Sequence, residues 1–452
     1  MHTQPDQRPD PISERIGLGM FTDREKEMAS LMKWVDLVEQ KVGRSRALVS
    51  HRRHGKTALM ERLYNILFRA DRNIMPFYFE IDDGIHKIWI KELAEMYFYA
   101  FIRQFLAYRT RDPELAFGKT WSPESLYEIA EQAGETAIME EIDWWERVDS
   151  VSDVIKVREV MHRMAHSMAD RTGLSIIVMF DEFQRLNRVV YQDEACTRPF
   201  ERYTDSFSTA AESSRAPMLI AGSEVTVLTQ EALWGSMLER VHARHIGRLP
   251  IAGGAALVNK FAKRHRLEID LDVAYTISRL VDGHPYYIWC LFHSECDDAD
   301  LTSEEGVKEV LTFEVENRLG HIHKFWHYHF GQHMKTFNLP HVRKMIFYLA
   351  QYTEEEVRVE KIQADLDLPI SVDETNEILQ KLIWCDLVIE NGDRFYSGLS
   401  DPLLARVLHI QYSWEIEQLT RKEVIKKIQA EWQDRRRRLV RILAVDSGES
   451  AG

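Results

Sequence analysis

The fold is decided by residues 47–57, which read Ala47-Leu48-Val49-Ser50-His51-Arg52-Arg53-His54-Gly55-Lys56-Thr57. A short apolar run leads into a loop, and the next residues place Leu59, Leu63, Ile66 and Leu67 on one face of a helix. A strand, a glycine-containing loop ending in Gly-Lys-Thr and a helix together predict a phosphate-binding loop. The backbone N–H groups at the start of such a helix point outward together, and the helix dipole favours an anion there.

The loop assigns a role to each of its residues. Lys56 would neutralise the β- and γ-phosphates of a nucleotide, and the Thr57 hydroxyl would ligate Mg²⁺. Ser50 occupies the place of the first glycine of the G-x-x-x-x-G-K-[ST] pattern. The residues expected to contact the nucleotide are Ser50, His51, Arg52, Arg53, His54, Gly55, Lys56, Thr57 and Ala58. Composition alone gives on the order of 0.2 Gly-Lys-Ser/Thr triplets in a chain this long, so a chance triplet is the alternative.

A second element favours the nucleotide. Five apolar residues, 176–180, end in Asp181-Glu182, and charges at the end of a buried strand lie where α/β sheets bind ligands. Asp181 is placed to hold Mg²⁺, and Glu182 to polarise a water that attacks the γ-phosphorus. An ordinary solvated strand end is the alternative.

Strands that alternate with long helices predict a parallel α/β sheet. Helices are expected over 21–42, 86–108 and 150–170, and further strands over 74–81 and 217–221. Residues 112–150 are acidic and rich in Trp, and we expect them to be an irregular insertion. Residues 1–20 read as a polar, disordered tail.

The C-terminal half reads as helical. Helical stretches over 343–351, 358–366 and 371–384 precede two apolar runs around Asn391-Gly392, a hairpin signal. Three helices and a hairpin predict a winged helix-turn-helix. We expect the P-loop core over 21–250, a helical lid over 251–338, the winged helix over 339–411 and a basic helix and tail over 412–452.

These motifs resemble the prokaryotic "archaeal ATPase" group of P-loop proteins, within the STAND and AAA+-related ATPases. The matching residues are Phe21, Arg24-Glu25, Glu27, Arg52-Arg53-x-Gly55-Lys56-Thr57, Asp181-Glu182-Phe183-Gln184, Gly222-Ser223 and Gly283-His284-Pro285-Tyr286-Tyr287. The resemblance spans about residues 20–410. It implies a five-stranded core, a helical lid and a winged helix packed on the nucleotide side.

The resemblance also implies further site residues. Arg24 would lie near the adenine, Ser223 would contact the γ-phosphate, and Pro285 would touch the base or ribose. Arg240 stands where relatives place an arginine that reads the γ-phosphate or a neighbouring subunit. Thr22-Asp23 stands where Val-Gly is usual, which bears on the contacts to the base.

Charge separates the possible partners. The whole chain carries a formal net charge of −14, and residues 341–410 hold seven basic and thirteen acidic residues. DNA binding depends on neutralised phosphates, so the winged helix is expected to contact protein. Residues 421–441 instead hold nine basic and three acidic residues. This segment is either a solvated helix face or a site that binds nucleic acid or an acidic partner.

Other features predict no chemistry of their own. His321, His323, His327, His329 and His333 include pairs at helical i,i+4 spacing, but neighbouring aromatics favour a packing surface over a metal. The four cysteines are expected to be reduced thiols. No apolar run reaches the ~18 residues of a membrane span, and the expected location is cytoplasmic.

The sequence therefore predicts a Mg²⁺-dependent ATP-binding switch that hydrolyses ATP slowly to ADP and phosphate. Lys56, Glu182 and Arg240 are the expected catalytic residues, and Thr57 and Asp181 the expected metal ligands. Its partner would be another protein or further copies of itself. One alternative is a DNA-associated factor resembling replication-initiation or transposition ATPases, which binds through its C-terminal helix. A scaffold that holds nucleotide without turnover is another.

Overall fold

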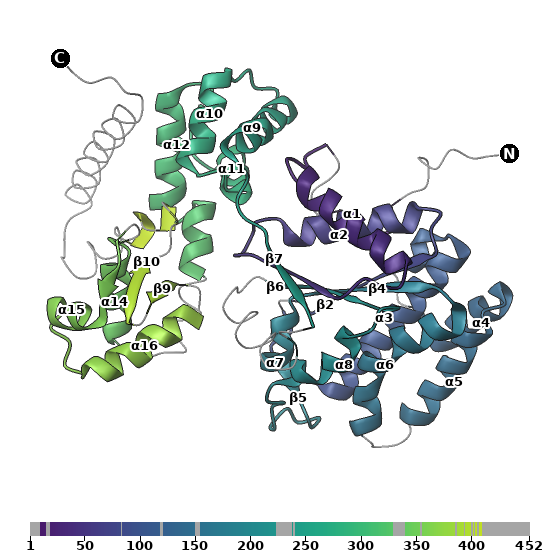
Figure 1. Ribbon diagram of the computed structural model, residues 1–452. Coiled ribbons are helices and arrows are strands. Elements are labelled where there is room, and N and C mark those ends of the chain that lie inside the picture. The colour runs from purple at the N-terminus through teal and green to yellow at the C-terminus, as the bar shows by residue number, and fades with distance from the viewer. Residues whose placement is uncertain are drawn as a thin grey trace, which may run out of the picture. The chain divides into compact units, whose positions relative to one another are not determined.

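A computed structural model gives the architecture (Figure 1). It describes residues 10–14, 19–82, 84–117, 121–149, 154–222, 237, 240–328, 340–352, 355–384, 387–392, 394–398, 401, 403–404 and 406–408. The chain divides into two compact units, Met1–Trp289 and Cys290–Gly452. The boundary falls inside the region expected to be the lid.

The first unit is built on a five-stranded sheet in the order β2-β4-β6-β1-β7, with every described pairing parallel. The strands are β1 (Arg46–Val49), β2 (Ile74–Glu80), β4 (Ser175–Asp181), β6 (Met218–Gly222) and β7 (His242–His245). This confirms the predicted parallel α/β core. Because these strands are parallel and only β6 separates β1 from β4, the loop after β1 and the acidic pair at the end of β4 lie at the same edge of the sheet.

Helices cover both faces of this sheet. In Figure 1, α1 and α2 lie on one side, and α3, α6 and α8 lie on the other. Their bounds are Glu25–Glu39 for α1, Lys56–Arg69 for α2, Ile90–Thr110 for α3, Val154–Thr172 for α6 and Ser208–Ala211 for α8. A short second ladder pairs β3 (Ile88–Trp89) with β5 (Val190–Tyr191), and α7 (Leu186–Val189) leads into it. Burial on both faces explains why β2 and β4 are nearly continuous apolar runs.

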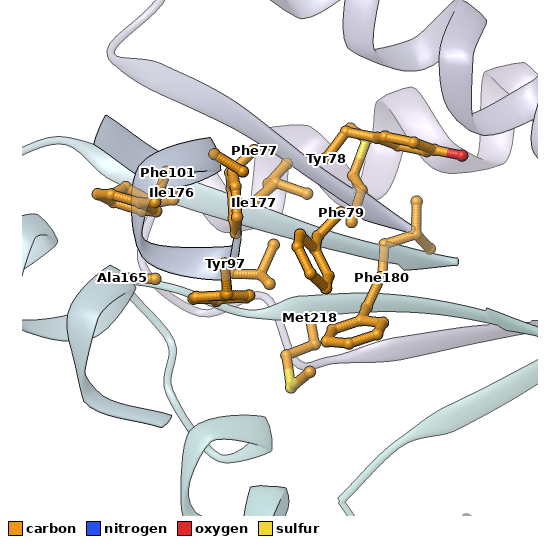
Figure 2. Packing of buried hydrophobic residues seen from close by; sticks show 14 of the residues in the cluster. Phe77, Tyr78, Phe79, Tyr97, Phe101, Ala165, Ile176, Ile177, Phe180 and Met218 are labelled. Atoms are coloured by element: carbon orange, nitrogen blue, oxygen red, sulfur yellow. The ribbon is translucent and has the colours of Figure 1, made fainter. Parts of the chain in front are cut away.

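An aromatic cluster fixes the central strands, as Figure 2 shows. Phe79 of β2 meets Phe180 of β4 edge to face, with ring centroids 5.3 Å apart. Tyr97 of α3 packs against Phe77 and Phe79, with centroids 5.0 and 5.1 Å away. Such edge-to-face pairs are worth roughly 0.5–1.5 kcal/mol beyond the area that they bury. The hydroxyl of Tyr78 extends away from these rings (Figure 2).

The expectation of an irregular segment over 112–150 is wrong. The chain forms a 3₁₀ turn (Pro113–Leu115) and two helices, α4 (Pro123–Ala133) and α5 (Thr136–Asp149). Ser122 caps α4 by accepting a hydrogen bond from the Ser125 N–H, Pro123 takes the first helical position, and Gly134 ends the helix at φ 70°. Trp145 of α5 stacks on Phe98 at 5.0 Å, so the tryptophan belongs to the core.

Three helices follow β7: α9 (Ile251–His265), α10 (Leu271–Leu280) and α11 (Pro285–Phe292). Small residues let α9 approach its neighbours. A Cβ on Gly254 would meet Ser278 Oγ at 2.1 Å, and a Cβ on Gly253 would meet the Asp23 carboxylate at 2.1 Å. The Lys260 ammonium donates to the Phe21 carbonyl over 2.6 Å, which ties α9 to the segment before α1.

The second unit contains α12 (Glu304–Glu316), α14 (Pro340–Leu349), β8 (Val357–Arg358), α15 (Val359–Asp365), α16 (Val372–Trp384), β9 (Val388–Gly392) and β10 (Phe395–Gly398). Its strands form an antiparallel sheet in the order β8-β10-β9. The predicted three helices and hairpin are confirmed, whereas their assignment as a winged helix stays a prediction. Arg406 pairs with Glu316 of α12 at 2.8 Å. The predicted N-terminal tail lies mostly, and the C-terminal helix entirely, outside the described residues.

Two glycines with left-handed backbone provide a matched test of the α9–α11 packing. Gly283 (φ 63°) has the Leu249 carbonyl oxygen 2.0 Å from where a Cβ would stand, whereas Gly134 (φ 70°) has nothing within 4 Å. Gly134→Ala should cost only the backbone strain, about 1 kcal/mol. Gly283→Ala should cost more than twice as much, because a backbone carbonyl cannot move aside. Thermal unfolding of both variants measures this, and equal losses would contradict the packing.

Candidate nucleotide-binding site

The loop between β1 and α2 turns through left-handed backbone. Gly55 has φ 94° and Arg53 has φ 62°. The helix α2 begins at Lys56, and its first backbone hydrogen bond runs from the Leu59 N–H to the Gly55 carbonyl over 3.0 Å. The N–H groups before Leu59 therefore have no acceptor within the helix, which is the arrangement that binds an anion.

The Lys56 side chain lies inside this loop and is 4% exposed. Its ammonium donates to the Ser50 carbonyl over 2.9 Å and to the His51 carbonyl over 3.3 Å, and lies 3.3 Å from the Ser50 hydroxyl. The ammonium therefore stands within the curve of the loop, where a phosphate held by the α2 N-terminus would meet it. The role of Lys56 toward phosphate stays a prediction.

The Thr57 hydroxyl donates to the Asp181 carboxylate over 2.6 Å, although 124 residues separate the two in sequence. Asp181 is fully buried at the end of β4. The Tyr78 hydroxyl lies 3.3 Å from the same carboxylate oxygen and 3.2 Å from a carboxylate oxygen of Glu80. The parallel register pairs Glu80 with Asp181, so both carboxylates stand at one edge of the sheet.

Glu182 follows Asp181 in a left-handed conformation, with φ 51° and ψ 39°. Its N–H donates to the Asp181 carboxylate over 2.9 Å. The Gln184 amide donates to the Glu182 carboxylate over 2.7 Å. The predicted catalytic carboxylate is thus held beside the predicted metal ligand.

These groups fit magnesium and a triphosphate. A hydroxyl and a carboxylate 2.6 Å apart are the oxygen ligands that Mg²⁺ takes, usually with waters and substrate phosphates completing the shell. The buried Lys56 ammonium and the N-terminus of α2 supply the positive ends that phosphate needs. The same edge of the sheet therefore offers both halves of a metal–nucleotide site.

Arg24 reaches the loop but contacts its backbone. It is 5% exposed, and one guanidinium nitrogen donates to the carbonyls of His54 and Gly247, over 3.0 and 2.7 Å. Another nitrogen donates to Glu27 over 3.1 Å. In this arrangement Arg24 ties the start of α1 to the loop, and its expected contact to adenine stays a prediction.

Two loop side chains meet residues of the α11 end. The Arg53 guanidinium lies 4.1 Å from the Tyr286 ring centroid, and the His54 and His284 rings lie 4.8 Å apart. His284 also stacks on Tyr287 at 3.9 Å. We call these Arg53–Tyr286 and His54–His284 pairs the loop–lid contact. Pro285, predicted to touch the nucleotide, opens α11 directly after His284.

Burial keeps both histidines of this contact neutral. Desolvation, followed by the charges of His51, Arg248 and Lys56, lowers the pKa of His54 to about 3. The pKa of His284 also lies well below its ordinary value, first because of burial and then because of His54 and nearby arginines. Nδ1 of each ring is buried and has no hydrogen-bond partner among the described residues.

One predicted site residue, Arg240, is not brought to the loop. Arg240 precedes β7 and pairs with Glu212, which precedes β6. Because His242 pairs with Arg46 at the start of β1, Arg240 lies at the amino edge of the sheet, opposite the loop. The expectation that Arg240 reads the γ-phosphate of its own chain is therefore wrong, and a role toward a neighbouring subunit stays a prediction. Ser223 lies outside the described residues.

Sequence reasoning missed Tyr78, Glu80 and the pairing of His54 with His284. Tyr78 and Glu80 end an apolar run, as Asp181 does, and that shared position was an available signal. The histidine pair joins residues 230 positions apart, so no local pattern predicts it.

The other side chains considered as metal ligands in the sequence form no cluster in the described part of the chain. Among the described residues, no group of three or more His, Cys, Asp or Glu could hold a metal ion. His323 and His327 stack 5.9 Å apart, and His323 Nδ1 bonds the Val315 carbonyl, whereas His329 and His333 lie outside the described residues. Cys196, Cys290 and Cys296 form no disulfide with described residues. None of the described helices has the length and hydropathy to cross a membrane.

Comparison with solved structures identifies the same architecture. The chain is similar to the Walker-type ATPase of Pyrococcus abyssi, with a TM-score of 0.56 and 16% identity over 89% of this chain and 99% of that one. It is more distantly similar to the ORC2 protein of Aeropyrum pernix (TM-score 0.47, 13% identity, 94% and 98% covered). It is also distantly similar to the RuvB Holliday junction branch migration motor of Thermotoga maritima, with a TM-score of 0.38 and 11% identity over 86% of this chain and 95% of that one.

No protein-family model matches the chain, and no curated protein matches it in sequence. The likeness to the P. abyssi ATPase therefore concerns the fold. Together with the loop and the acidic pair, it shows that the chain has the P-loop NTPase fold.

The depressed histidine pKa values predict a loss of stability in acid. The folded pKa of His54, about 3, lies below its ordinary value of 6.5, so between these pH values the unfolded chain binds a proton that the folded chain does not. The contribution of each such histidine to the free energy of unfolding is fully present above pH 6.5. Below that pH the free energy of unfolding falls by about 1.4 kcal/mol for each pH unit. His54→Phe should therefore remove about 2 kcal/mol of the stability difference between pH 7 and pH 5.

Denaturant unfolding at both pH values measures this difference, and His284→Phe should act in the same direction. His86→Phe, at an exposed position, is the matched control. An unchanged acid sensitivity in both His54 and His284 variants would show that the contact does not hold neutral rings.

Proposed function

We propose that this protein is a Mg²⁺-dependent ATP-binding protein that hydrolyses ATP slowly to ADP and phosphate and changes conformation with its nucleotide state. The observation that carries the proposal is the hydrogen bond between Thr57 and Asp181, beside a buried Lys56. This brings together the hydroxyl, the carboxylate and the ammonium that phosphoryl transfer with Mg²⁺ requires.

The residues have separate tasks. Lys56 turns from the loop carbonyls to the β- and γ-phosphates, because a charged phosphate oxygen is a stronger acceptor for its ammonium than a neutral carbonyl is. Thr57 and Asp181 would hold Mg²⁺, which would supply positive charge to offset that of the phosphates. Glu182 orients the attacking water and accepts its proton.

The loop–lid contact supports the conformational part of the proposal. Arg53 and His54 belong to the loop that would hold the phosphates, and both side chains meet residues at the start of α11. A movement of the loop on phosphate binding would therefore displace the start of α11 through the Arg53–Tyr286 and His54–His284 pairs. The α9–α11 helices are the lid in this account.

Two substitutions separate turnover from binding. Glu182→Gln should bind ATP with wild-type affinity yet lose about 10²–10⁴-fold in hydrolysis rate, because an amide cannot accept the proton of the attacking water. Lys56→Ala should lose binding itself. Phosphate release and titration with a non-hydrolysable ATP analogue measure the two quantities.

Arg72→Ala, which precedes β2 at the amino edge of the sheet and pairs with Asp36, is a control for both. Wild-type phosphate release by the Glu182 variant would remove Glu182 from the mechanism. Binding without release by the wild-type chain would instead favour the nucleotide-holding scaffold.

The nucleic-acid alternative depends on residues 421–441, whose nine basic residues exceed their three acidic ones. Within the described part of the second unit, α16 begins with Asp373 and Glu374, which repel phosphate. If the basic segment binds duplex DNA, a chain ending at residue 411 should no longer bind DNA. Each lost phosphate contact should reduce the slope of log binding constant against log salt concentration by roughly 0.9. No retention by the intact chain at low salt would leave protein partners or self-assembly.

A further inference from the structure

The carboxylate of Glu182 is held by a neighbour that the proposed mechanism does not use. Gln184 donates through its amide nitrogen to Oε2 of Glu182 over 2.7 Å. Gln184 is 1% exposed, so this bond forms away from bulk water. A buried hydrogen bond to a charged group is stronger than one between neutral groups and fixes the direction of both side chains.

The turn that carries both residues is anchored at two further points. Phe183, between them, packs edge to face on Phe180 and Phe207, with ring centroids 5.2 and 5.4 Å apart. The Arg185 N–H bonds the Glu182 carbonyl over 2.9 Å, and the Arg185 guanidinium donates to the Ile85 carbonyl over 2.6 Å. The amide of Gln184 therefore sits on a rigid support.

The other end of the Gln184 amide has no partner within the described part of the chain. Its Oε1 is buried and accepts no hydrogen bond from the described residues. An unpaired buried oxygen lowers stability, and a methionine of similar size would avoid that loss. The amide cannot rotate to relieve it, because Oε1 would then face the Glu182 carboxylate. A residue that costs stability and contacts the proposed catalytic group is better explained by function than by packing.

We propose that Gln184 is a positioning residue that fixes the Glu182 carboxylate in the direction required to orient the attacking water. The inference rests on the proposed function and adds a residue that acts only through Glu182. Held at Oε2, the Glu182 side chain cannot rotate freely, so its other oxygen keeps one direction. Gln184 is therefore expected to affect the rate of hydrolysis and to leave nucleotide affinity alone.

The first experiment compares rate with affinity. Gln184→Met has similar volume and no donor, and should lower kcat about tenfold, as expected when a reacting group is misplaced by a fraction of an ångström. Its Kd for a non-hydrolysable ATP analogue should stay within about twofold of wild type, since binding depends on other groups. Gln184→Glu, the isosteric change, should lower kcat too, and serves if the Met variant does not fold. Gln192→Met, at an exposed position whose amide donates to the Pro199 carbonyl, is the control.

The second experiment asks whether Gln184 acts through Glu182. In a Glu182→Ala background, Gln184→Met should cause no further loss of rate. Thermal unfolding of the nucleotide-free wild type, both single variants and the double variant gives a readout that needs no turnover. The midpoint shifts of the single variants should not add, because the two residues share one hydrogen bond.

The outcomes separate this inference from the proposed function. If Glu182→Gln retains hydrolysis, or if the wild-type chain has none, both are overturned. If Glu182 is required but Gln184→Met keeps wild-type kcat, or its effects on rate and midpoint simply add to those of Glu182→Ala, only the positioning role is overturned. A parallel loss of affinity and kcat in Gln184→Met and Gln184→Glu would likewise show a general structural role.

Discussion

The hydrogen bond between Thr57 and Asp181 joins the first turn of α2 to the end of β4, across the intervening strand β6. It forms only because the strands are parallel and in the order β2-β4-β6-β1-β7, which brings their carboxyl ends to one edge. The aromatic packing of Phe79, Phe180 and Tyr97 stabilises the pairing of β2 with β4 under helix α3. Lys56 and Glu182 adjoin the two bonded residues in sequence, and the Tyr78 hydroxyl contacts the Asp181 carboxylate.

In the proposed function the loop–lid contact transmits a signal from the nucleotide, but its interaction energy is too small to generate that signal. A cation–π pair such as Arg53–Tyr286 contributes about 0.5–2 kcal/mol, and an aromatic pair such as His54–His284 a similar amount. Changing a two-state population from 1:99 to 99:1 needs about 5.5 kcal/mol of differential binding. In the proposed function that energy comes from the γ-phosphate with its Mg²⁺, because ADP lacks the γ-phosphate.

The sequence predicted the elements whose signal is local. The apolar run, the Gly-Lys-Thr loop and the strand ending in Asp181-Glu182 appear where expected, because each is one continuous stretch with its own periodicity. Features that depend on register or chain reversal were not predicted. Tyr78 and Glu80 become site residues only through the pairing of β2 with β4, and His284 only through the return of α11 to the loop.

Two errors have physical explanations. The 112–150 segment looked irregular because its acidic residues outweighed its capping signals, yet Ser122, Pro123 and Gly134 mark one helix as clearly as any in the chain. Arg240 was assigned by its place in a family pattern, and strand direction puts it at the opposite edge of the sheet. Sequence position alone does not tell which end of a strand a neighbouring residue will occupy.

In the proposed function, the nucleotide state of the loop sets the conformation of the α9–α11 helices. Hydrogen exchange over residues 251–289 measures this most directly, in the nucleotide-free protein, with ADP, and with Mg²⁺ and a non-hydrolysable ATP analogue. Protection should be greatest with the ATP analogue and lower with ADP, with the largest change around Gly283 and His284, which adjoin the loop–lid contact. Identical protection in all three states would show that these helices do not respond to the nucleotide and would rule out the nucleotide-controlled switch.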